Sequence, residues 1–252
     1  MNSMSSMRGV FITGTDTGVG KTFVTCGLAA ALCRQGKKVG VLKPVETGCE
    51  VRNRELYPSD TFNLIRSAGS VLPPQLVCPY RLPAPLAPEA AAEAAGVTIE
   101  KATILDHYHQ IATQHDITLV EGAGGLLVPL AEDYTFADLI LDLDIPLVVV
   151  VASRLGAINH TLLTLHCAET LGLSVHGYIL NHPHMDADLA TQTNGQVLAR
   201  WTRVPCLGTV PFSPRASGEE ADADTLAVLF ARSVDLSRLL EQGTEVRARH
   251  ES

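Results

Sequence analysis

Short apolar runs alternate with longer segments of helical period along the chain, and this alternation limits the fold more than any other feature. The short runs have the length of strands and are apolar throughout. Such strands are typical of parallel sheets with helices on both faces. The runs are "GVFIT", "VGVLK", "ITLVE", "PLVVVVA" and "VHGYIL", and the helical segments are 21–35, 60–68, 100–114, 135–143, 157–171 and 187–200. We therefore predict a three-layer α/β fold with a mostly parallel central sheet flanked by helices.

Glycines and prolines mark the boundaries of these segments. Gly36, Gly69 and Gly172 follow predicted helices, and Ser59 can cap a helix that starts at Asp60. Six prolines interrupt residues 71–88, "VLPPQLVCPYRLPAPLAP". Prolines at this density break regular elements, so we expect a long surface connection that shapes the mouth of a site.

Length and composition place the chain among globular proteins with one large core. It has 252 residues, of which 46% are hydrophobic, and no linker divides it. We expect a single domain over residues 1–252, with a flexible leader at 1–7 and a tail that frays from about residue 241. The start, "MNSMSSM", lacks the features of a secretion signal, and no apolar run approaches the roughly 20 residues of a membrane helix. These features favour a cytoplasmic protein without a membrane partner.

Charge and cysteine usage favour small-molecule partners. The formal net charge is -8 and the pI is about 5.5, which argues against a nucleic-acid or anionic-membrane surface. The six cysteines are widely spaced, without a C-x-x-C pair or a His/Cys cluster at metal spacing. We interpret them as reduced thiols.

The stretch "GTDTGVGKT", residues 14–22, lies between the first predicted strand and the first predicted helix. Its glycines let backbone N–H groups converge on a phosphate at the N-terminal end of the helix. The usual G-x-x-x-x-G-K-[ST] pattern places glycine at position 15, but this chain has Thr15 there and Gly14 one residue earlier. A glycine-rich turn without a ligand is the alternative. The flanking strand and helix favour a P-loop, in which Lys21 neutralises phosphate charge and Thr22 binds Mg²⁺.

Charged residues end two further predicted strands. Lys43 ends "VGVLK" and opens "KPVETG", a loop that presents Glu46 and Thr47. A phosphate or carbamate oxygen is a plausible target for this lysine, and a solvated lysine at a strand end is the alternative. Glu121 ends "ITLVE", where P-loop proteins hold Mg²⁺ through a carboxylate. A turn-capping role is the alternative for this acid.

Four further features depend on their context. The glycines after Glu121, among them Gly124, allow a substrate to approach the backbone. Considered alone, the position of Asp60 in the first turn of a helix indicates that it stabilises the helix dipole. We interpret His160 as structural and not catalytic, since no Ser or Cys nucleophile motif accompanies it. The helix start at residues 156–159 is a good anion site.

Taken together, the motifs "GTDTGVGKT", "KPVETG", "SD" at 59–60, "VEGAGGLLVPL", "TFADL", "LGAINHTLLT" and "LN" at 180–181 resemble those of dethiobiotin synthetases. The resemblance covers roughly residues 8–212. It implies a P-loop NTPase-like fold, and it explains the longer loop, since that family shares a G-x₅-G-K-T pattern. Position 18 is Gly where some members carry Glu, and position 47 is Thr where others carry Ser.

The resemblance also implies a reaction. The family forms the ureido ring of dethiobiotin from 7,8-diaminopelargonate, CO₂ and MgATP, and it releases ADP and phosphate. One amine captures CO₂ as a carbamate, ATP phosphorylates the carbamate, and the second amine closes the ring.

Site residues follow from the same resemblance. Lys21, Lys43 and Thr17 are the implied catalytic residues, and Thr22, Asp60 and Glu121 surround Mg²⁺. The implied nucleotide-binding residues are Gly14, Thr15, Asp16, Thr17, Gly18, Val19, Gly20, Lys21 and Thr22, with Asn181 and Pro211 at the base. The implied substrate-binding residues are Thr47, Gly124, Gly156, Ala157, Ile158 and Asn159. In the family the helix start at 156–159 serves the neighbouring subunit, which implies a homodimer.

Two other classes share parts of this pattern. A cobyrinate-type amidoligase has a similar "EGAG" element but draws ammonia from a fused glutaminase domain, for which only about 40 residues remain after "LGTVP". A partitioning or signalling ATPase usually carries an extra lysine early in its loop, where this chain has Thr15 and Asp16. We therefore favour the synthetase.

Overall fold

The central sheet is fully parallel. The computed structural model describes residues 9–185, 189–214 and 222–240. Six strands lie in the order β12-β11-β10-β1-β7-β2, and each neighbouring pair is parallel. These strands are β1 (Gly9–Gly14), β2 (Val39–Leu42), β7 (Ile117–Glu121), β10 (Leu147–Ala152), β11 (Val175–Asn181) and β12 (Cys206–Val210). The prediction of a mostly parallel sheet is confirmed, with β12 as an additional edge strand.

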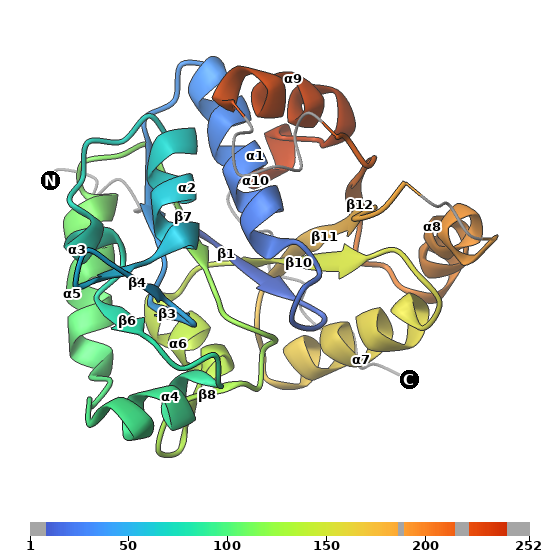
Figure 1. Ribbon diagram of the computed structural model, residues 1–252. Helices are drawn as coiled ribbons and strands as arrows, with labels where there is room; N and C mark the ends of the chain where they lie inside the picture. Colours follow the sequence, from blue (N-terminus) through green and yellow to red (C-terminus); the bar gives the residue numbers. More distant parts are fainter. Residues whose placement is uncertain (1–8, 186–188, 215–221, 241–252) are drawn as a thin grey trace, which may run out of the picture.

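Helices cover both faces of the sheet (Figure 1). One face carries α1 (Lys21–Arg34), α2 (Ser59–Ser67), α9 (Ala223–Ser233) and α10 (Ser237–Leu240). The other face carries α4 (Pro88–Ala95), α5 (Lys101–Ala112), α6 (Phe136–Leu143), α7 (Ala157–Thr170) and α8 (Leu189–Trp201). Val10 and Ile12 of β1 enter the first core, while Phe11 enters the second. Two apolar cores explain why the strands are apolar at every position.

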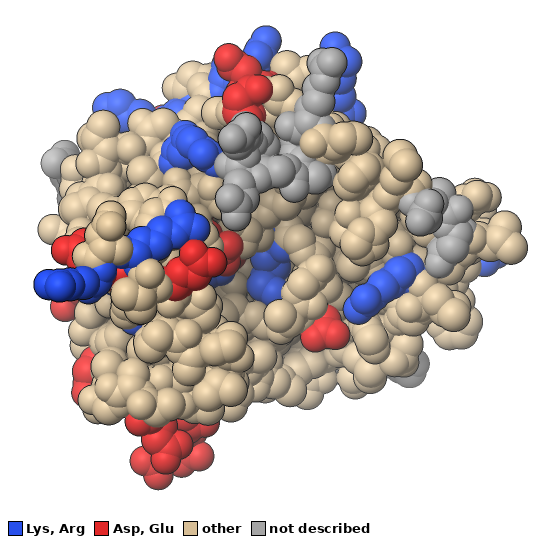
Figure 2. All heavy atoms as spheres, in the orientation of Figure 1, with Lys and Arg blue, Asp and Glu red and all other residues tan. Residues whose placement is uncertain are grey.

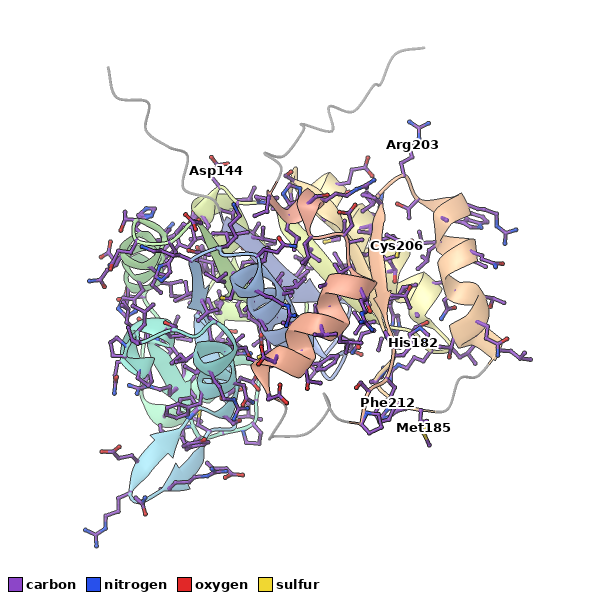
Figure 3. All side chains as sticks on the ribbon, turned by 90° about the horizontal axis from the view of Figure 1, so that it is seen from above. Asp144, His182, Met185, Arg203, Cys206 and Phe212 are labelled. Atoms are coloured by element: carbon purple, nitrogen blue, oxygen red, sulfur yellow. The ribbon has the colours of Figure 1, made fainter. Side chains whose placement is uncertain are left out.

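The parallel arrangement brings all six carboxyl ends of the strands to one edge. Figure 3 shows this polarity: Asp144 and Arg203, which precede β10 and β12, lie at one edge, and His182 and Phe212, which follow β11 and β12, lie at the other. Open α/β sheets bind ligands at the carboxyl edge. Most of the site residues expected from the sequence lie at or just after the ends of strands there, and Asp60 lies in α2.

Smaller elements decorate this edge. A short parallel pair joins β3 (Val45–Thr47) to β6 (Tyr80–Leu82), and β4 (Glu50–Arg52) forms a hairpin with β5 (Glu55–Tyr57). A third pair joins β8 (Pro129–Ala131) to β9 (Tyr134–Thr135).

The expectation that residues 71–88 lack regular elements is wrong, because this segment contains β6 and the short helix α3 (Pro74–Val77). Its prolines fall where no donor is needed, for example Pro74 in the first turn of α3. The segment also reaches the loop after β3, where the Gly48 N–H donates to the carbonyl of Ala84 at 3.1 Å.

Helix ends agree with the sequence except at α2 and the C-terminal region. Gly36, Gly69 and Gly172 have positive φ after their helices. The expected cap at Ser59 is wrong, since α2 begins at Ser59 and its N-cap is Pro58. Helices α9 and α10 were not anticipated. Helix α9 packs so closely on α1 that a Cβ at Gly27 would lie 2.1 Å from the Phe230 ring.

The terminal expectations lie largely outside the described residues. The leader at 1–7 and the tail from 241 belong to the ranges without a described structure, so the single-domain expectation for 1–252 stays a prediction. Within the described ranges, no helix is both long and apolar enough to cross a bilayer.

Candidate active site

The loop between β1 and α1 has the backbone of a phosphate cradle. Gly18 and Gly20 have φ of 73° and 92°, a region that side chains disfavour. Gly20 is the N-cap residue of α1, so the first turn of the helix faces the loop without a side-chain cap. A Cβ at Gly14 would lie 2.7 Å from Cγ2 of Val19 and 3.2 Å from Nζ of Lys21. The displaced glycine is therefore required by the tight wrap of this longer loop.

Lys21 places a cation over the same loop. Its Nζ donates to the backbone carbonyl of Asp16 at 3.0 Å. Burial lowers the pKa of Lys21 to about 8, and this effect outweighs the opposing attraction of Glu121. An anion bound in the loop would favour the charged lysine.

A buried ion cluster joins the ends of β2 and β7 to α1 and α2. Nζ of Lys43 donates to Oδ2 of Asp60 at 3.0 Å and to Oε1 of Glu121 at 2.5 Å. Oγ1 of Thr22 donates to the same oxygen of Glu121 at 2.7 Å. The structure thus brings together Lys43 and the three residues expected at Mg²⁺.

The charges in this cluster stabilise one another. Burial alone would lower the pKa of Lys43, but Glu121 and Asp60 together raise it above its usual value. Burial would likewise raise the pKa of Asp60, but Lys43 holds it below its usual value. The lysine and the aspartate are therefore both charged at neutral pH.

The donor set fits a divalent cation shared with phosphate groups. Oε2 of Glu121 is buried and has no hydrogen-bond partner among the described residues. Two carboxylates and one hydroxyl give hard oxygen ligands, as Mg²⁺ prefers. The described ranges contain no group of three His, Cys, Asp or Glu side chains at metal spacing, so a Mg²⁺ ion here would need phosphate oxygens and water to complete its shell.

Asn181 adjoins the phosphate loop from the end of β11. Its Nδ2 donates to the carbonyl of Val19 at 2.9 Å, and its buried Oδ1 has no partner within the part of the chain described here. That oxygen can accept from the amino group of a base. Pro211 follows β12, where the His182 N–H donates to the carbonyl of Val210 at 3.0 Å. The two expected base-binding residues thus lie at the carboxyl ends of neighbouring strands.

The glycine loop after β7 lies against the phosphate loop. A Cβ at Gly124 would be 3.7 Å from Oγ1 of Thr17, and a Cβ at Gly125 would be 3.3 Å from the Gly14 carbonyl. Thr17 is exposed, and its N–H donates to Oδ1 of Asp16 at 2.7 Å. Gly124 and Thr17 therefore face the same space. Figure 2 shows this face hollowed, with basic atoms in the hollow and acidic atoms beside it.

Some predicted residues are not joined to the cluster. Thr47 is half-buried, and residues 156–159 begin α7 after β10. Gly156 is exposed and has φ of 92°. Among the described residues, neither Thr47 nor this helix start has a recorded hydrogen bond to Lys43, Asp60 or Glu121, so their roles stay predictions.

The roles of two buried polar residues were not predicted from the sequence. The carboxylate of Glu46 binds the start of α2. Asn194 of α8 donates to Oγ of Ser153 at 3.3 Å and to the carbonyl of Arg154 at 3.0 Å, which holds the segment before α7. Neither contact follows a local pattern. An acid in the already marked "KPVETG" loop was the sole signal for Glu46.

Comparisons with known proteins agree with this geometry. A family model described as an AAA domain matches residues 8–220. The chain is 40% identical over 236 residues to the ATP-dependent dethiobiotin synthetase BioD of Bacillus licheniformis, which covers 94% of this chain and 97% of that protein. It is 41% identical over 208 residues to the protein of the same name from Anaeromyxobacter dehalogenans, covering 82% and 92%.

A solved structure shares the fold at much lower identity. The MinC:MinD cell division protein complex of Aquifex aeolicus matches with a TM-score of 0.58 and 15% identity, covering 96% of this chain and 98% of that one. At this identity the likeness concerns the fold alone. The predicted P-loop NTPase-like fold is confirmed.

Proposed function

The chain belongs to the ATP-dependent dethiobiotin synthetases, ligases of biotin biosynthesis, and from this premise we propose that it closes the ureido ring of dethiobiotin from 7,8-diaminopelargonate and CO₂. Family membership brings ATP and Mg²⁺ with it. The observation that carries the proposal is the buried Lys43 between Asp60 and Glu121, beside Thr22 of the phosphate loop. Phosphoryl transfer needs positive charge and positioning more than a strong base.

Each residue of the site takes one task in this proposal. The loop at 14–22 cradles the phosphates, and Thr17 and Lys21 bind the phosphate oxygens that gain negative charge during the transfer. Lys43 and Thr47 bind the carbamate and the transferred phosphoryl group. Thr22, Asp60 and Glu121 would hold Mg²⁺, which supplies positive charge to the phosphates when bound.

The remaining residues orient the ends of the substrates. The free Oδ1 of Asn181 accepts from the amino group of adenine, with Pro211 beside it. Gly124 leaves room for the diamine near the phosphate loop. The two substrate amines act as nucleophiles themselves, so the protein needs no nucleophilic side chain.

The carboxylate of the diamine requires a site several methylenes away from its amines. We assign it to the start of α7, where Gly156, Ala157, Ile158 and Asn159 present backbone N–H groups and the positive end of the helix. Leu155 and Leu163 are 84% and 60% exposed at this helix. Exposed leucines beside an anion site support a homodimer in which α7 serves the partner's site. The six free cysteines support a location in the reducing cytoplasm.

One assay tests the reaction. ADP release is measured with diaminopelargonate and bicarbonate, each omitted in turn, and dethiobiotin is detected by mass spectrometry. Release that needs both substrates is the expected result. Release without the diamine would instead favour a switch ATPase.

The shared site has a separate test. Gly156→Val should raise the KM for the diamine with little effect on ADP binding, because the new side chain blocks the helix start. Heterodimers of Gly156→Val with Lys21→Ala should recover one intact composite site. A verified heterodimer without activity would place the carboxylate site within one subunit.

A further inference from the structure

Glu46 of β3 binds the start of α2 with both of its carboxylate oxygens. Oε1 accepts from the N–H of Asp60 at 2.9 Å, while Oε2 accepts from the N–H of Thr61 at 2.9 Å and from its Oγ1 at 2.6 Å. Glu46 is 4% exposed and Thr61 is fully buried. These contacts join a strand and a helix that are separated in the sequence by the β4–β5 hairpin.

This carboxylate replaces a missing local cap. The N-cap residue of α2 is Pro58, which provides no side-chain acceptor. The first N–H groups of a helix have no partner within the helix, and the positive end of its dipole favours a negative charge. Glu46 supplies both the acceptors and the charge from another element. The position of the first turn of α2 therefore depends on β3.

Asp60 extends this link into the ion cluster. Its backbone N–H is held by Glu46, while its side-chain Oδ2 lies 3.0 Å from Nζ of Lys43. The Asp60 side chain is 38% exposed, so burial alone does not fix it. We propose that Glu46 is a positioning residue that sets Asp60 for its contacts with Lys43 and Mg²⁺, an inference that rests on the proposed function.

The hydrogen bonds separate the role of Glu46 from that of Glu121. Both oxygens of Glu46 already accept hydrogen bonds from the start of α2, Oε2 from two donors and Oε1 from one. Glu121, in contrast, keeps a buried oxygen that has no hydrogen-bond partner in the part of the chain that the structure describes. Two buried acids near one lysine thus have different tasks: Glu121 binds directly, and Glu46 holds a residue that binds.

The test compares two variants that remove different bonds. Glu46→Gln keeps the shape, but its amide nitrogen cannot accept, so one N–H of α2 loses its acceptor. Thr61→Val removes the hydroxyl bond and leaves both N–H bonds to Glu46 in place. Calorimetric titration with ADP, with and without MgCl₂, gives the factor by which Mg²⁺ strengthens ADP binding. Thermal unfolding of both variants gives their loss of stability.

We expect Glu46→Gln to reduce the Mg²⁺-dependent factor by roughly tenfold or more, in the range seen for outer partners of metal ligands. Binding of ADP without metal should stay within about twofold, and Thr61→Val should keep the wild-type factor. An unchanged factor in Glu46→Gln, or an equal loss in both variants at equal stability, would overturn the inference. If Glu46→Gln does not fold, Glu46→Asp is judged by the same criteria, since its shorter side chain cannot reach both N–H groups.

These readouts do not depend on synthesis. A wild-type protein that makes no dethiobiotin would refute the proposed function, while the ADP titrations would still decide the role of Glu46. A wild-type protein that makes dethiobiotin, together with an unchanged Mg²⁺-dependent factor in Glu46→Gln, would refute the role of Glu46 alone.

Discussion

Replacing Lys43 by methionine should destabilise the protein severely. A second substitution should restore most of the lost stability. Methionine keeps the length and the apolar packing of the lysine but removes its charge. The Lys43 side chain is 5% exposed and that of Glu121 is 0% exposed, so the variant leaves a carboxylate in the interior without its cation. Thr22 then remains as its single recorded hydrogen-bond donor in the described structure.

The size of the effect follows from this burial. Removing one partner of a buried ion pair costs about 3–5 kcal/mol. The loss of the Asp60 contact adds little to this destabilisation, because the Asp60 side chain is 38% exposed and water can solvate its charge. At roughly 2–4 °C per kcal/mol for a chain of this size, the midpoint of thermal unfolding should fall by roughly 6–20 °C. Glu121→Gln in the same chain removes the orphaned charge and keeps an acceptor for Thr22, so the double variant should regain most of this loss.

Urea unfolding of the wild type, both single variants and the double variant measures the coupling. Since the pKa of Lys43 lies above its usual value, the stabilisation by this pair is fully present below the ordinary lysine pKa and is lost only as pH rises through the raised value. Measurements at pH 7 therefore report the whole effect. Additive losses in the double variant would refute the reasoning, because uncoupled residues add.

Three further predictions concern the nucleotide and the metal. Burial lowers the pKa of Lys21 to about 8, so ADP affinity should fall as pH rises above about 8, and calorimetry in buffers of different ionisation enthalpy should detect proton uptake on binding. Gly20→Ala should weaken ADP binding more than Gly18→Ala does: a Cβ at Gly20 would lie 2.2 Å from Nδ2 of Asn181, whereas one at Gly18 meets nothing within 4 Å. Equal losses would contradict the importance of that contact. Glu121→Gln should raise the Mg²⁺ concentration for half-maximal rate by roughly tenfold or more, and an unchanged Mg²⁺ titration would count against Glu121 as a ligand.

The predictable part of the fold lay in local patterns. Continuous apolar runs predicted parallel strands, as the structure confirms. Lys43 and Glu121 were expected at the ends of two strands, and the structure brings them together at one edge of the sheet. Asp60 was different, because its local position favoured a role toward the helix dipole. A place for Asp60 near Mg²⁺ was implied by the family resemblance alone, and its contact with Lys43, which joins residues on separate elements, was not predicted.

The missed part lay in contacts between distant segments. Glu46 caps a helix that begins beyond the intervening hairpin, and a reading of local caps assigned that task to Ser59. Helix α9 is fixed by the fit of Phe230 over Gly27, which depends on the absence of a side chain at a distant position. The prolines of 71–88 concealed β6, because its partner strand β3 lies more than one element away. Such pairings leave no periodic signal.

The central place of β1 in the sheet has a consequence during synthesis on the ribosome. Gly9 pairs with Thr118 on one side, and Phe11 pairs with Leu147 on the other. This apolar strand is made early, but its first neighbour is absent until β7 has left the exit tunnel, and its second is absent until residue 147 has left it. Non-local parallel pairing is slow and exposes apolar surface to aggregation. We expect nascent chains that end before β10 to leave at least one side of this strand unprotected, which makes them substrates for chaperones that shield apolar segments.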